Sequence, residues 1–71
     1  MKYLFVVEKG PRNYSAYVPD LPGCVATGKT RKEVEKNIRA AIVFHLQGLK
    51  ADGTPPHPPE AYAQYQEVTL P

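Results

Sequence analysis

One stretch of this 71-residue sequence matches a motif that binds phosphate. Residues 23–30 read GCVATGKT and satisfy G-x-x-x-x-G-K-[ST], in which backbone N–H groups wrap around a phosphate and the lysine neutralises its charge. The motif requires a buried strand before its first glycine, whereas a proline-rich turn precedes Gly23. Residues 24–27 are typical of an extended strand, and no later apolar strand ends in an aspartate for magnesium. We therefore interpret Gly28 as part of a strand-to-helix turn, and we expect no nucleotide and no other cofactor.

The other reactive side chains are few and scattered. Cys24 with His45 or His57 could form a thiol–imidazole pair, but a single cysteine in a strand is usually a small buried hydrophobic residue. A metal-dependent nuclease would need several carboxylates converging from strands, and only Glu8 and Asp20 lie near predicted strand ends. We therefore expect no catalytic residue and no metal site, and predict that the protein is not an enzyme.

A basic face on the predicted helix supports a second hypothesis. The formal net charge is only +2, which does not by itself indicate nucleic-acid binding. Basic side chains nevertheless gather at the start of the helix, at Lys29, Arg31, Lys32, Lys36 and Arg39. Their ordinary role is a solvated helix surface, and binding of RNA or DNA phosphates is the alternative function.

The elements that position these residues form one small α+β domain over residues 1–71. Strands are expected at residues 2–8, 14–18 and 24–27, followed by a helix and a short last strand at residues 67–70. The order is therefore β-β-β-α-β, an antiparallel-type sheet with one covering helix. Since the first strand is apolar on both faces, we place it inside the sheet. The proline-rich residues 54–59 should run extended.

The helix begins at Thr30, where Thr30 and Glu33 fit a capping box. Apolar residues then recur at helical spacing, at Val34, Ile38, Ala41, Ile42, Leu46 and Leu49. Val43 and Phe44 fall off this stripe, which indicates a second packing partner. We predict that these two residues form an interface between copies of the chain; the alternative is that the C-terminal segment of the same chain covers them.

Size and composition favour a soluble, self-associating protein. Apolar residues make up 42% and charged residues 23% of the chain, as in globular domains. A single cysteine excludes an internal disulfide, so a homo-oligomer, dimer or tetramer, is the expected source of extra stability. There is no basic-apolar leader at Met1 and no apolar run near twenty residues, so we expect a cytoplasmic protein without a membrane segment.

Three stretches of sequence carry a family resemblance. They are the opening strand MKYLFVVE at residues 1–8, the stretch AYVPDLPGC at residues 16–24, and GKT at residues 28–30 before the helix. The second is the most specific. Together they resemble the N-terminal domain of HicB-type antitoxins over about residues 1–60.

The resemblance implies a partial ribonuclease-H-like fold and a binding function. HicB-type antitoxins neutralise a small HicA-type RNA-cleaving toxin by occluding it, and do no chemistry themselves. Members commonly continue into a promoter-binding module, for which there is no room before Pro71, so the resemblance leaves promoter autoregulation open. The implied partner is a HicA-type toxin or a divergent protein.

We place the partner-binding surface at a predicted type II turn and the strand before it. The residues concerned are Tyr17, Pro19, Asp20, Leu21 and Pro22. Tyrosines are favoured at interfaces because they bury a large area at little entropy cost. Besides Tyr17, the candidates are Tyr14, Tyr62 and Tyr65, and at most half of the four are expected at an interface.

Overall fold

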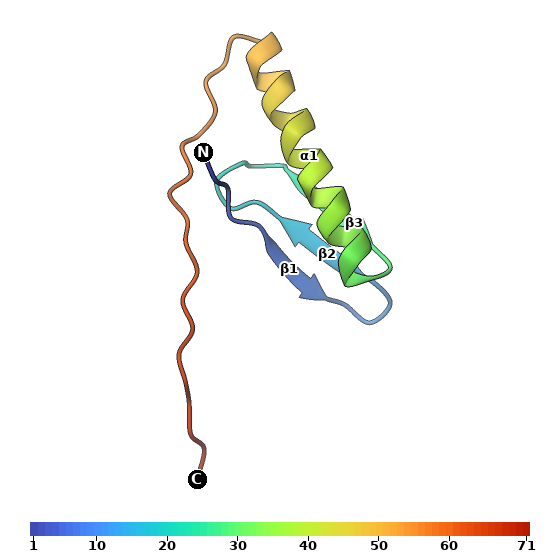
Figure 1. The fold of residues 1–71 in the computed structure, drawn as a ribbon, viewed down its shortest axis with the longest axis vertical. Coiled ribbons are helices and arrows are strands. Elements are labelled where there is room, and N and C mark those ends of the chain that lie inside the picture. The colour runs from blue at the N-terminus through green and yellow to red at the C-terminus, as the bar shows by residue number, and fades with distance from the viewer.

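Three short strands form one antiparallel sheet in the computed structural model, which describes residues 1–71. The strands are β1 (Val6–Lys9), β2 (Tyr14–Tyr17) and β3 (Val25–Gly28), in the spatial order β1-β2-β3. One helix, α1 (Arg31–Ala51), lies across one face of the sheet (Figure 1). The predicted α+β class, with three strands before a covering helix, is confirmed.

Both ends of α1 are fixed by local sequence. The Thr30 hydroxyl accepts a hydrogen bond from the Glu33 N–H at 3.0 Å, and the Glu33 carboxylate accepts one from the Lys29 N–H at 3.2 Å. At the other end Gly53 has φ +70°, and the N–H groups of Gly53 and Thr54 return to carbonyls of the last turn. This Schellman arrangement satisfies carbonyls that would otherwise lack partners.

The core lies between α1 and the sheet. Its fully buried members are Ala16, Val18, Leu21, Cys24, Val34 and Ile38. The two helix residues come from the predicted apolar stripe and are 0% exposed. Side chains of the N-terminal segment, among them Tyr3, Phe5 and Val7, are half-buried and pack against this cluster.

Two predictions about the sheet are wrong for the single chain. The first strand lies at an edge, not inside the sheet. The predicted strand at residues 67–70 does not form. Residues 54–71 contain no helix or strand, and their last part projects beyond the folded body (Figure 1). The two errors have one cause. A strand inside the sheet needs a partner on each edge, and in the single chain β1 (Val6–Lys9) has only β2.

Candidate partner-binding surfaces

The turn after β2 is rigid and closely hydrogen-bonded. The Cys24 N–H donates to the Leu21 carbonyl at 3.0 Å, and Gly23, at the third position of this turn, has φ +83°. This is the predicted type II turn, whose third residue needs positive φ. A second bond, from the Leu21 N–H to the Val18 carbonyl at 3.1 Å, fixes the chain just before it.

The residues of this turn divide between the core and the surface. Leu21 is 1% and Asp20 is 8% exposed, so neither lies on the surface where the sequence analysis placed it. Pro19, Pro22 and Tyr17 are exposed. The alternation that buries Ala16 directs Tyr17 to the opposite face of the sheet. Leu21 and Asp20 therefore shape the turn from within, and the exposed three remain the predicted contacts.

The Asp20 carboxylate holds the C-terminal segment against the body. Its Oδ2 atom accepts hydrogen bonds from the N–H groups of Glu60 at 3.0 Å and Ala61 at 2.8 Å. His57 Nδ1 lies 3.9 Å from Oδ1, and the Tyr3 hydroxyl donates to the His57 carbonyl at 2.7 Å. This contact is not predictable from the sequence, because no local pattern links Asp20 to backbone groups forty residues away.

Residues 23–30 do not form a phosphate loop. Residues 25–28 are β3, paired with β2, and so their backbone is extended. A Cβ atom added at Gly28 would lie 2.5 Å from the Val34 nitrogen and 2.9 Å from its Cα. Gly28 is therefore the point where the end of β3 approaches the first turn of α1, in agreement with the interpretation of the sequence.

The remaining candidates for chemistry are not brought together. Cys24 is buried, and its burial raises the pKa of the thiol above the ordinary 9.0. No hydrogen bond joins Cys24 to His45 or His57. No three side chains among the histidines, cysteine and carboxylates form a group that could hold a metal ion. None of the structure's helices has the length and apolar character needed to cross a membrane.

The outer face of α1 carries an exposed apolar pair. Phe44 is 78% and Val43 is 56% exposed. The C-terminal segment does not cover them, so the alternative in which it does so is wrong. Of the basic residues at the start of α1, Arg39 is already engaged, since its guanidinium lies 5.4 Å from the Phe5 ring centroid and 4.0 Å from the Glu35 carboxylate.

A second apolar surface lies on the face of the sheet that α1 does not cover. Val6, Tyr17 and Val25 are neighbours in the strand register and form a row across all three strands on this open face. Val25 is 65% and Tyr17 is 42% exposed. Both layers of the domain therefore present apolar side chains to solvent.

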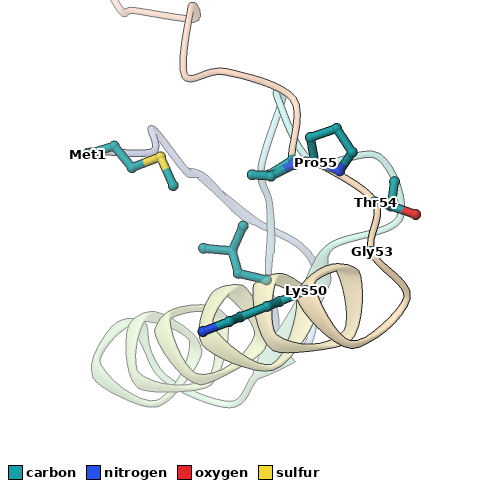
Figure 2. Close-up of a pocket in the computed structure, with 7 residues that line it drawn as sticks. Met1, Lys50, Gly53, Thr54 and Pro55 are labelled. Carbon is teal, nitrogen blue, oxygen red and sulfur yellow. The ribbon is translucent and has the colours of Figure 1, made fainter.

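The hollow drawn in Figure 2 lies between the last turns of α1 and the start of the C-terminal segment. It has a volume of about 480 Å³. Met1 stands on one side and Thr54 and Pro55 on the other (Figure 2). Lys50 supplies the one ionisable side chain of the lining, which is otherwise formed by Met1, Leu46 and residues 53–56.

The fold and its surfaces define a class of protein: a small α+β domain that exposes apolar side chains on both its helix and its sheet. Residues 3–69 match the HicB-like antitoxins of bacterial toxin–antitoxin systems. The chain belongs to this family. Its fold also resembles that of a chain from a solved HicA3 and HicB3 toxin–antitoxin complex, with a TM-score of 0.67 and 32% identity over 83% of this chain and 69% of that one.

Similar proteins come from a bacterium, an archaeon and a phage. A UPF0150 protein of Helicobacter pylori is 47% identical over 66% of this chain and 65% of its own length. A UPF0150 protein of Thermoplasma acidophilum is 43% identical over 70% and 74%. An uncharacterized 14.9 kDa protein of Haemophilus phage HP1 is 40% identical over 73% of this chain and 39% of its own length. The match thus spans less than two thirds of the Helicobacter and phage proteins.

Proposed function

We propose that this protein is a non-catalytic binding module that neutralises a HicA-type toxin by covering it. The observation that carries the proposal is the family match over residues 3–69, together with the likeness to a chain of a HicA3 and HicB3 complex. The rigid turn after β2 supports it, because a preformed surface loses little conformational entropy on binding.

The toxin contacts the exposed side of this turn and the adjoining open face of the sheet. Tyr17 is the anchor, since a partly exposed aromatic side chain on a rigid strand gains much buried area when it binds. Pro19 and Pro22 flank it and have few conformations to lose. Leu21 and Asp20 act indirectly by holding the turn in shape.

The test is to mix the protein with a HicA-type toxin from the same source. Light scattering after size exclusion should show a mixed complex, and RNA cleavage by the toxin should stop at a stoichiometric ratio. Separate elution with undiminished cleavage would show that this toxin is not the target.

A matched pair of variants locates the surface. Tyr17→Asp should weaken the complex at least about tenfold, because a charge would be desolvated at the contact. Asn13→Asp adds the same charge before the other end of β2 and should leave affinity unchanged. Equal affinities for the two variants would place the toxin elsewhere on the molecule.

Self-association through the outer face of α1 completes the proposal, in a protein that acts in the cytoplasm. Phe44 and Val43 give a patch that a second copy would cover. Phe44→Asp should lower the mass in solution, whereas Asn13→Asp, which adds the same charge in the exposed β1–β2 loop, should not. An unchanged mass for Phe44→Asp would remove the helix patch as an interface.

A further inference from the structure

Residues 62–71, here called the tail, are exposed along their whole length. The tail includes four large apolar or aromatic side chains that are at least two thirds exposed: Tyr62, Tyr65, Val68 and Leu70. The one hydrogen bond made by its side chains is internal, from the Gln66 side chain to the Glu67 carbonyl at 3.0 Å. Isolated apolar residues on a surface are ordinary, but four within nine residues of extended chain are not.

The tail has the residue types and the extended backbone of a β-strand but pairs with no other strand. Its Tyr, Val and Thr residues are types enriched in strands, and its sequence pattern predicts a strand at residues 67–70. Its backbone is extended and makes no ladder. A strand is stable only when its backbone N–H and C=O groups pair with another strand, so the tail needs an acceptor edge.

Of the two edge strands of the sheet, β1 is the less blocked. At β3 the Asn37 side chain donates a hydrogen bond to the Thr27 carbonyl at 2.8 Å, which occupies part of that edge. No side chain and no loop hydrogen-bonds to the backbone of β1, which pairs only with β2. An unblocked edge of this kind is a template for a further strand.

Hydrogen bonds within the chain direct the tail away from the β1 edge of the same molecule. The Asp20 and Tyr3 bonds hold residues 57–61 against the body, and beyond them the chain leaves it and ends past the β1–β2 hairpin (Figure 1). The molecule is consequently 54 Å long but only 27 Å and 16 Å in its other dimensions. A projecting segment of this length is suited to reach a neighbouring molecule.

Charge favours a second copy as that neighbour. All nine lysines and arginines lie within residues 2–50, whereas residues 54–71 carry only the carboxylates Glu60 and Glu67. Around the β1 edge the cations Lys9 and Arg12 outnumber the one carboxylate, Glu8, whereas the one charged side chain of the tail is Glu67. The tail and the β1 edge therefore carry opposite net charge, which favours their pairing between two copies.

We propose that the tail of one chain pairs as an added strand with the edge of β1 in a second copy, and that the exchange is reciprocal. The product is a two-fold dimer with two four-stranded sheets. The missing last strand of the β-β-β-α-β order is then supplied by the partner. This interface is separate from the helix patch at Phe44 and does not depend on any toxin.

The test uses the full-length chain with Phe44→Asp, so that the helix patch cannot contribute. Light scattering should give twice the 7.9 kDa mass of one chain. Adding Val68→Pro and Thr69→Pro should reduce the mass to that of one chain, because adjacent prolines remove whichever N–H faces the neighbour. The matched control, Val68→Ile with Thr69→Val, keeps strand-forming residues and the same charge, and should remain a dimer. A single-chain mass for the Phe44→Asp chain, or a dimer that survives both prolines, would overturn the proposal.

Amide exchange identifies the edge. In the dimer, outward N–H groups of β1 should exchange slowly, and the two prolines should remove that protection while leaving β3 unchanged. Loss of protection at β3 instead would overturn the assignment to β1. Since the substitutions lie in an exposed segment, the helical circular dichroism should stay the same, which separates loss of pairing from loss of folding.

Discussion

Gly28→Ala should destabilise the fold strongly, although it adds only one methyl group. The new Cβ would lie 2.5 Å from the Val34 nitrogen and 2.9 Å from its Cα. Carbon atoms in good contact are about 3.5–4.0 Å apart, so the start of α1 would have to move by about 1 Å. The obstacle is helix backbone, which cannot rotate aside as a side chain would.

The cost follows from what the first turns of α1 bury. Val34 and Ile38 are both 0% exposed and are the helix's two fully buried residues. A gap of about 1 Å forfeits up to about half of each dispersion contact across it, and overpacking costs about 1–3 kcal/mol. We expect the upper half of this range, a large share of the about 4–10 kcal/mol typical of a domain of this size.

Thermal unfolding followed by circular dichroism, at one protein concentration, measures the effect. A loss of about 2–3 kcal/mol should lower Tm by about 10–20 °C. The matched control is Gly48→Ala, a glycine inside α1 whose added Cβ would meet nothing within 4 Å. This control should gain about 1 kcal/mol, because alanine is the better helix former. If Gly28→Ala unfolds at or above the wild-type Tm, the close approach of β3 and α1 described above is refuted.

Four further experiments test the core and the helix cap. Leu21→Ala should cost about 3 kcal/mol in urea unfolding, because it leaves a cavity under the turn; a cost below about 1 kcal/mol would mean that Leu21 is not buried. Thr30→Ala should cost about 1 kcal/mol through loss of the bond to the Glu33 N–H, and Thr54→Ala, also exposed, should cost much less. Cys24 should resist thiol reagents at neutral pH until the protein unfolds, because burial raises its pKa. For the same reason the folded state should lose stability as the pH rises through 9.0, where the unfolded thiol ionises, and Cys24→Ser should flatten this dependence.

Local sequence was enough to predict that three strands form, the helix start and the type II turn, but the first strand begins at Val6 and not at Lys2 as predicted. Each depends on residues close together in the chain, such as Thr30 with Glu33, or Pro22 with Gly23. The place of the first strand in the sheet was wrong, because strand order depends on what pairs with an edge. A strand with two apolar faces has the same sequence whether its neighbour comes from its own chain or from another.

The surfaces were less predictable than the fold. Exposure of Phe44 followed from its angular position on the helix, and the structure agrees. The roles of Asp20 and Leu21 did not follow from the sequence, because a polar residue in a turn is ordinarily solvated. The Asp20 carboxylate is buried because it accepts hydrogen bonds from the N–H groups of residues 60 and 61, which are far away in the sequence.

The fully buried core has a kinetic consequence. All six of its members lie in one stretch of sequence from Ala16 to Ile38. Contacts between residues so close in sequence need only short loops to close, so this part should fold first and fast, at a rate independent of protein concentration. In the proposed dimer, the exposed residues 62–71 pair only after two chains have met. That second step is therefore expected to be slower in dilute solution, which would separate the two events in time as the protein is synthesised.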